Sequence, residues 1–302
     1  MGFHCGKAHP EGVTALTFVL VLTSAALHAL WNFLVKRSGA SGPVFIWLFT
    51  LPSTLLLAPI ALWLIIARHM TFTLLAVLFL LGSAVIHTVY FLLLSRGYRD
   101  GDLSVVYPIA RGTGPLLAGM IAMIALKERP TIGAIAGALC IAGGAMLLAR
   151  DQRAGELKPG ASKVRSVEYG LLIGVSIGIY TVWDKFLVGT LAVNPLILEW
   201  VATTLIGVLV TPAAMRNLPL ARSMWQKHKA VAISGALLSS ASYILFLTAL
   251  AVSAVSRVAP LRETSILIGA LLGTRILGEG RTRQRLAAAG AISAGVILVS
   301  LG

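Results

Sequence analysis

Residues 13–35 read VTALTFVLVLTSAALHALWNFLV, a run of 23 residues without a Lys, Arg, Asp or Glu. At 1.5 Å per residue a helix of this length spans about 34 Å, close to the hydrocarbon thickness of a bilayer. The alternative is a secretory signal with Ser24-Ala25-Ala26 as its cleavage site, but the run is long for a signal and Lys7 is the one lysine before it. We interpret residues 1–12 as a leader and 13–35 as a transmembrane helix.

Nine further apolar windows follow the first. They lie at 43–67, 71–95, 103–126, 131–149, 168–188, 194–214, 229–251, 254–278 and 283–301. Charged residues make up 12% of the 302 positions, against roughly a quarter in a soluble domain. The predicted fold class is therefore an all-α integral membrane protein with ten transmembrane helices.

The net charge of +14 does not indicate a nucleic-acid partner, because most Lys and Arg residues sit in short gaps between apolar windows. They number 16 in the odd-numbered connections, when Lys229, Arg283 and Arg285 at the adjoining window ends are included, and about four in the leader and even-numbered connections. This asymmetry places both termini outside by the positive-inside rule. Cys5 and Cys140 are the two cysteines, so a disulfide framework is not expected.

The second half of the chain repeats unusual residues of the first at an offset of 152. The matched pairs are Trp31 with Trp183, Asn32 with Asp184, Ser104 with Ser256, Pro108 with Pro260, and Gly143 with Gly295; Glu128 meets Glu279 at an offset of 151. We predict one repeat at 13–149, a polar linker at 150–167 and a second repeat at 168–302. Five helices per repeat is an odd number, so the repeats must enter the membrane with opposite orientations, as in many transporters.

Three motifs carry a family resemblance: His28-Ala29-Leu30-Trp31-Asn32, residues 101–112 with the sequence GDLSVVYPIARG, and residues 258–263 with the sequence VAPLRE. They resemble the EamA-like branch of the drug/metabolite transporter superfamily, from about residue 13 to 302. The resemblance implies ten helices, export of a small metabolite or drug, often coupled to protons, and both termini in the cytoplasm. We expect this family arrangement, although the charge count favours the opposite one.

Charged side chains in the spanning windows are few, since each costs roughly 2.5 to 3.5 kcal/mol at the bilayer centre. Arg111 and Glu263 lie eight and nine residues into their helices, about 12 to 14 Å deep, and are related by the same offset. We predict that they face each other across the pseudo-twofold axis, as an ion pair or as a substrate clamp that also involves Arg262. The alternative is a structural pair that only fixes the two halves in register.

Two polar and aromatic stripes are predicted to line a translocation cavity. His28, Trp31 and Asn32 share one helix face at i, i+3 and i+4, and Trp183 and Asp184 take the matching places in the second half with Tyr180. The two tryptophans could instead be interfacial anchors. Further candidates for the cavity are Tyr90, Tyr107 and Tyr243, with Glu199, and the helix-bending Pro108 and Pro260, which could also be plain kinks.

Four groups are candidates for carrying a coupling proton: Glu263, Asp184, His28 and His87. A histidine in a helix can also be a hydrogen-bonded packing residue. We expect no catalytic residues, no metal site and no cofactor, because the phosphate-binding, zinc and nucleophile motifs of enzymes are missing from the sequence.

These features together predict a transporter of a small polar metabolite, amino acid-like, or of a drug. It would work by alternating access, as proton-coupled export, in a bacterial inner membrane. The expected partners are the small-molecule substrate, the lipid bilayer, protons and a second copy of the chain. The alternatives are a flippase for lipid-linked headgroups with the same fold, and a membrane accessory subunit or enzyme.

Overall fold

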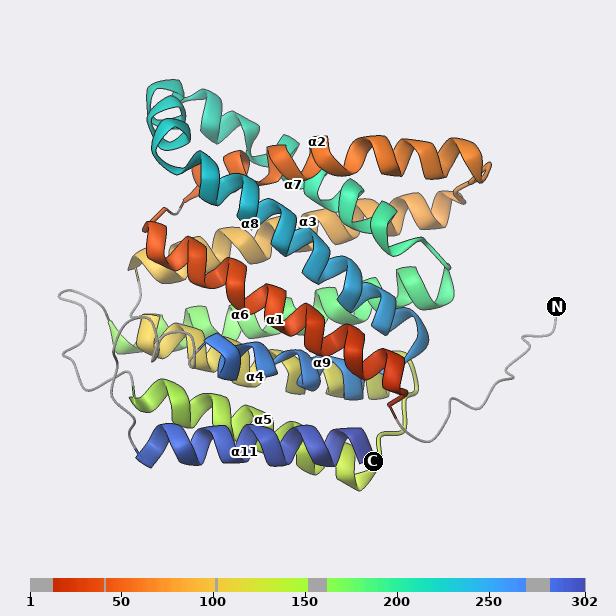
Figure 1. Cartoon of the computed structure of the whole chain (residues 1–302), viewed down its shortest axis with the longest axis vertical. Helices are drawn as coiled ribbons and strands as arrows, with labels where there is room; N and C mark the ends of the chain where they lie inside the picture. Colours follow the sequence, from red (N-terminus) through yellow and green to blue (C-terminus); the bar gives the residue numbers. More distant parts are fainter. Residues whose placement is uncertain (1–12, 41, 101–102, 152–161, 270–282, 302) are drawn as a thin grey trace.

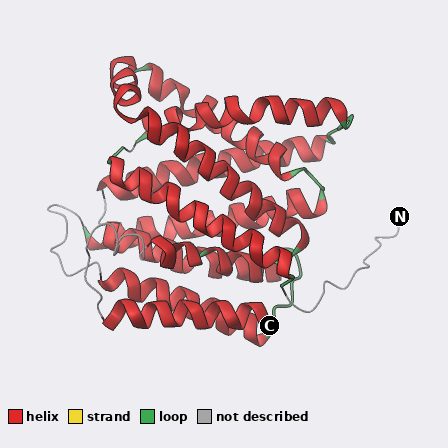
Figure 2. Cartoon of the chain, in the orientation of Figure 1, coloured by secondary structure: helices red, strands yellow, loops and turns green. Residues whose placement is uncertain are grey.

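The structure is a computed structural model that describes residues 13–40, 42–100, 103–151, 162–269 and 283–301. Within these residues the chain forms helices, turns and short loops, and no β-strand (Figure 2). The helices are α1 (Ala15–Ser38), α2 (Pro43–Ala67), α3 (Leu74–Asp100), α4 (Leu103–Ala125), α5 (Ile132–Asp151), α6 (Lys163–Lys185), α7 (Pro195–Met215), α8 (Leu218–Val252), α9 (Val255–Arg262) and α11 (Arg283–Leu301). A single π-helical turn, η1 (Phe186–Thr190), follows α6.

Seven of the described helices are long and apolar enough to cross a membrane: α1, α2, α3, α4, α6, α7 and α8. α5 and α11 contain shorter apolar stretches, Ile132–Leu147 and Ala287–Leu301. Large apolar side chains such as Leu55, Trp63 and Ile124 are exposed on the outside of the bundle. Lipid accommodates such a surface, so the chain is a multi-pass integral membrane protein, and the count of ten helices stays a prediction.

Three helices depart from the predicted windows. α6 begins at Lys163, because Ser162 caps it by accepting a hydrogen bond from the Arg165 amide, so the end of the predicted linker is helical. α8 begins at Leu218 rather than at 229, behind the cap Asn217. The window at 254–278, in which Pro260 was expected to bend the helix, is interrupted, since α9 ends at Arg262.

α9 runs two residues past Pro260, whose missing amide hydrogen removes one bond of the helix, and then ends at Arg262. The Glu263 amide bonds to the Pro260 carbonyl, and the Ile266 amide bonds to the Glu263 carbonyl, both three residues back. The chain turns at Glu263 and is helical again over 264–269. Residues 270–278 of that window lie outside the described residues.

The two halves of the chain are interlocked (Figure 1). α1 packs on α8 and α3 packs on α6, while α2 meets α7, α4 meets α9 and α5 meets α11. Each of these pairs joins one helix from each half, and α1 and α6 run in opposite directions. Neither half could bury its inner surface without the other, as the inverted two-repeat architecture requires.

Two ends of the bundle are distinguished below. The termini face is the end where Ala15 begins α1 and Leu301 ends α11, on the right in Figure 1. The far face is the other end, where Ser38 ends α1 and Pro43 begins α2. The start of α1 and the end of α11 therefore lie at the same face of the bundle.

α5 and α11 approach most closely where Gly137 faces Gly295. A Cβ placed on Gly137 would lie 2.6 Å from the Gly295 carbonyl oxygen and 2.6 Å from a methyl of Val299. Small residues at such crossings let helix backbones pack directly inside a membrane. Gly143, on the same helix, has nothing within 4 Å of its Cβ position.

We predict that Gly137→Ala lowers stability by about 1 to 3 kcal/mol, because the added methyl must push the two backbones apart. The matched control Gly143→Ala, on the same helix, should be neutral. The measurement is the unfolding temperature of each purified variant in detergent. Equal unfolding temperatures for the two variants would contradict the close crossing.

Candidate functional site

A polar and aromatic cavity lies among helices of both halves. Its volume is about 70 Å³. Its lining residues are His28, Trp31, Phe49, Thr50, His87, Tyr90, Phe91, Tyr180, Glu199, Ala202, Thr203, Ile206, Ser239, Tyr243 and Arg262. Such a mixture of ring faces with a few charged groups is typical of small-molecule sites.

The cavity lies between the two faces of the bundle. On the far-face side, Trp31 is within about two turns of the end of α1, and Phe49 is within about two turns of the start of α2. On the other side, Glu199 is about one turn from the start of α7. Buried apolar clusters pack at both ends, with Leu187 at the termini face and Phe45 at the far face.

Arg111 and Glu263 are in contact, as the repeat offset predicted. Arg111 Nη1 lies 3.3 Å from Glu263 Oε1, and both side chains are buried, with 8% and 3% of their residue surface exposed. Arg111 Nη2 also lies 2.5 Å from His28 Nε2. The second carboxylate oxygen, Glu263 Oε2, has no hydrogen-bond partner among the described residues.

Arg262 lies beside this pair with its charge over two aromatic rings. Its Cζ is 4.2 Å from the Phe246 ring centroid and 5.2 Å from that of Tyr243. Such stacking stabilises a guanidinium by up to about 2 kcal/mol when it is desolvated. Arg262 Nε has no hydrogen-bond partner among the described residues, and the side chain lines the cavity.

Hydrogen-bond donors outnumber acceptors around His28. Arg111 Nη2 approaches one ring nitrogen, while Trp31 Nε1 and Arg262 Nη2 lie 3.2 and 3.5 Å from the other. A neutral imidazole offers only one acceptor nitrogen, and the two guanidinium groups share one carboxylate, Glu263. This arrangement favours a further anionic acceptor, such as the carboxylate of a bound solute.

Asp184 forms a second polar network on the other side of the cavity. It is fully buried and accepts hydrogen bonds from Ser83 Oγ at 2.6 Å and from the Tyr243 hydroxyl. His87 Nε2 lies 3.2 Å from the Tyr243 oxygen and 3.7 Å from Asp184 Oδ2. His87 and Tyr243 line the cavity, so this network connects Asp184 to it.

Glu199 places a carboxyl group in the wall of the same cavity. It comes from α7, whereas Arg262 comes from α9, and it is 6% exposed. The cavity therefore has a cationic and an acidic lining group. Sequence analysis named Glu199 only as a further candidate, because nothing in a single sequence shows which face of an apolar helix is turned inward.

Several predicted site residues are not part of the cavity wall. Trp183 stacks on Phe79 at 4.4 Å and donates to the Phe79 carbonyl, so it is a packing residue. Asn32 Nδ2 bonds to the backbone of its own helix at His28. Tyr107 lies 5.6 Å from Arg111 Cζ, behind the charged cluster.

The repeated prolines Pro108 and Pro260 were both candidates for the cavity. Pro260 instead lines a second cavity, the apolar groove described below. Pro108 falls within α4, and its side chain lies outside the described residues, as does Glu279.

Sequence reasoning missed Ser83 and Thr203. Ser83 lies four residues before His87 on α3, a spacing that puts the two on one helix face and could have identified it. Thr203 lies four residues after Glu199 on α7, so these two residues also share a helix face. Phe49 and Thr50 carried no such signal, because they line the cavity only through the packing of α2 on α7 and α8.

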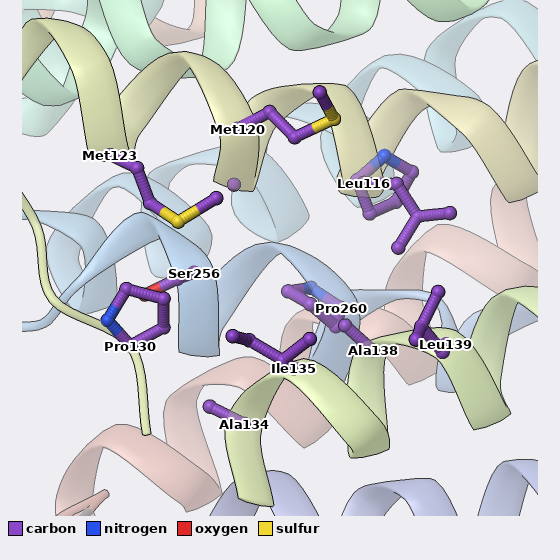
Figure 3. Close-up of a pocket in the computed structure, with 12 residues that line it drawn as sticks. Leu116, Met120, Met123, Pro130, Ala134, Ile135, Ala138, Leu139, Ser256 and Pro260 are labelled. Carbon is purple, nitrogen blue, oxygen red and sulfur yellow. The ribbon is translucent and has the colours of Figure 1, made fainter. Parts of the chain in front are cut away.

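A second cavity is an apolar groove between α4, α5 and α9 (Figure 3). Its volume is about 240 Å³. Its lining includes Met120, Met123, Ile135, Leu139 and Pro260, with Ser256 as a polar member. Exposed Met120 and Leu139 on its rim open it toward lipid.

An interlocked pair of inverted halves with charged residues at mid-depth is the architecture of a membrane transporter. A model of the EamA-like transporter family matches residues 15–150 and again residues 165–301. The chain belongs to this family, within the drug/metabolite transporter superfamily.

The fold also matches solved structures. One crystal structure, described only as that of a protein, is 16% identical with a TM-score of 0.75, and the match covers 94% of this chain and 96% of that one. This likeness concerns the fold alone. No curated protein matches the sequence.

We predict that Arg111→Met destabilises the protein by about 3 kcal/mol, since it leaves Glu263 buried without its counter-charge. The double variant Arg111→Met/Glu263→Gln should recover at least half of the loss. Arg216→Met, which removes an exposed arginine at the end of α7, is the matched control and should change little. The measurement is unfolding in detergent; additive losses in the double variant would contradict the pairing.

Proposed function

We propose that the protein transports a zwitterionic solute, such as an amino acid, by alternating access through the polar and aromatic cavity. The observation that carries the proposal is the cavity lining. Arg262 and His28 belong to a donor-rich, net-positive cluster that suits a carboxylate, while Glu199 in the same wall suits an ammonium group. The rings of Trp31, Tyr90 and Tyr180 offer an apolar surface for the rest of the solute.

Proton coupling is part of the same proposal. A proton and the ammonium group of the solute compete for Glu199, because a protonated carboxyl group no longer attracts a cation. Such competition produces exchange of solute for protons, which would drive export. Glu263, with one oxygen unpartnered, is a second candidate for the proton-coupling residue, followed by Asp184, His87 and His28.

We also propose that the protein lies in a bacterial cytoplasmic membrane and that it forms a homodimer.

The first test is counterflow in proteoliposomes with amino acids, sugars and cationic drugs. We expect exchange of amino acids, and an increase in the apparent KM of about 10- to 100-fold for Arg262→Met, since hydrogen bonds to charged groups contribute about 1.5 to 3 kcal/mol. Glu168→Gln, which changes an exposed carboxylate on α6, is the control and should behave as wild type. Exchange of sugars or cationic drugs without amino acids would reject the zwitterionic substrate.

The second test separates the coupling residues. With a proton gradient imposed, wild-type uptake should exceed uptake without it, and Glu199→Gln should keep counterflow but lose the response to the gradient. Glu263→Gln is measured in parallel. If Glu263→Gln alone abolishes the response, Glu263 is the coupling residue; if both variants respond as wild type does, neither carboxyl group carries the proton.

The apolar groove supports a second candidate, a flippase for a lipid-linked headgroup. The groove opens to lipid and is lined by Pro260 of α9, the helix that also carries Arg262 (Figure 3). An acyl chain could lie in the groove while the headgroup entered the cavity. Movement of a fluorescent lipid between leaflets, without amino-acid counterflow, would favour this candidate over the first.

A further inference from the structure

The start of α8 extends beyond the hydrocarbon of the bilayer at the far face (Figure 1). α8 has 35 residues and is about 52 Å long, whereas even a helix tilted by about 40° crosses the hydrocarbon in roughly 26 residues. Residues 230–252 carry no charge, so they form the part inside the hydrocarbon. We call residues 216–229, the first turns of α8 with the turn before them, the basic segment.

The basic segment lies at the depth where lipid headgroups meet the hydrocarbon. Ala221 packs with Val44 and Leu48, which belong to the first two turns of α2 at the far face. Trp47 and Trp225 pack against the same cluster, and tryptophan is enriched at membrane interfaces. The start of α8 is therefore attached to the bundle at the interface rather than projecting into water.

The segment turns one helix face inward and carries its charges on the remaining surface. The inward side chains are buried or half-buried and follow the i, i+3, i+4, i+7 spacing of one face: Ala221, Met224, Trp225 and His228. Arg222, Lys227 and Lys229 are exposed, and so is Arg216 at the end of α7. Four cations of the basic segment thus point away from the protein.

These four cations have no counter-charge from the chain. They form no ion pair among the described residues. The sequence has no Asp or Glu between Glu199 and Glu263, and none between Glu11 and Asp100, a stretch that contains α1 and α2. α1, α2 and α7 pack most extensively on α8, and Glu199 lies near the opposite end of α7. The positive charge of this corner is therefore complementary to an anion from outside the chain.

Exposed apolar side chains lie next to the cations along the chain. Met215, Leu218 and Leu220 are 55%, 40% and 43% exposed, beside Arg216 and Arg222. Cations together with exposed apolar side chains at the interface are typical of an element that contacts anionic lipid. An acidic soluble protein would match the charges, but lipid matches both the charges and the apolar side chains at this depth.

We propose that the basic segment binds an anionic phospholipid, whose phosphate contacts the four cations while its acyl chains lie along the apolar surface of the bundle. A zwitterionic lipid has no net charge to match them. Each Lys or Arg near an anionic membrane surface strengthens binding about fivefold. No residue of the basic segment lines the polar and aromatic cavity, so this site is separate from the solute site.

The test measures which lipid lies beside the segment in a bilayer. Cys5 and Cys140 are replaced by Ser, and a fluorophore is attached at Ser223→Cys, an exposed position among the cations. The protein is placed in phosphatidylcholine vesicles that contain phosphatidylglycerol or phosphatidylcholine with the same nitroxide quencher on an acyl chain. The mole fraction of labelled lipid that halves the fluorescence reports the local enrichment of each lipid.

We expect labelled phosphatidylglycerol to halve the fluorescence at about a tenfold lower mole fraction than labelled phosphatidylcholine, because several cations attract one headgroup. The neutral variant Arg222→Gln/Lys227→Gln/Lys229→Gln should reduce this preference to about twofold. Arg222→Lys/Lys227→Arg/Lys229→Arg, which keeps the charges, should retain it. Salt at about 1 M should weaken the preference in the reference protein, since exposed charges are screened.

The matched control is Arg68→Gln/Lys127→Gln/Arg129→Gln, which removes three exposed cations from connections at the termini face and should keep the preference. Equal quenching by the two lipids in the reference protein would overturn the proposal and leave the cations to water or to an acidic protein. A preference that survives in the neutral variant, or that is lost equally in the control, would also overturn it. The attraction would then belong to the net charge of the chain rather than to this segment.

Discussion

A charge buried at the centre of a bilayer needs a counter-charge from within the protein, and this chain meets that need across its two halves. Arg111 comes from α4 and Glu263 from the turn after α9, and each would be an isolated buried charge without the other. Because the two residues come from different halves of the chain, their contact joins the halves. The pairings of α1 with α8, of α3 with α6 and of α5 with α11 surround this contact.

The site that we propose depends on an excess of hydrogen-bond donors around His28. Arg262 adds a second guanidinium, while Glu263 is the carboxylate paired with Arg111 and Glu199 lines the same cavity as Arg262. The charge of Arg262 is stabilised by the rings of Phe246 and Tyr243, which attract a cation without neutralising it. A fully neutralised cluster would hold the halves together equally well but would offer nothing to an anionic group.

Helix ends show the same reliance on distant parts of the chain. α9 ends at Arg262, and the chain turns at Glu263, whose amide bonds to the Pro260 carbonyl and whose carbonyl accepts from the Ile266 amide. At the other end of α9, Glu128 provides the cap that Ala254 cannot. The short helix that carries the charged residues is thus fixed at both ends by features outside its own apolar packing.

The sequence alone determined that this is a membrane protein built from two related halves, because apolar runs of bilayer length and a repeated set of rare residues are properties of the chain itself. It also indicated the contact of Arg111 with Glu263, since a charge cannot lie at that depth without a partner. Only the tertiary structure decided that Trp183 is a packing residue while Glu199 and Arg262 share a cavity, that the predicted helix at 254–278 breaks at Glu263, and that Glu128 reaches the start of α9. The reason is physical: every face of these helices is apolar enough for lipid or for a protein interior, so the pattern of the sequence does not reveal which face turns inward, and packing between distant helices makes that choice.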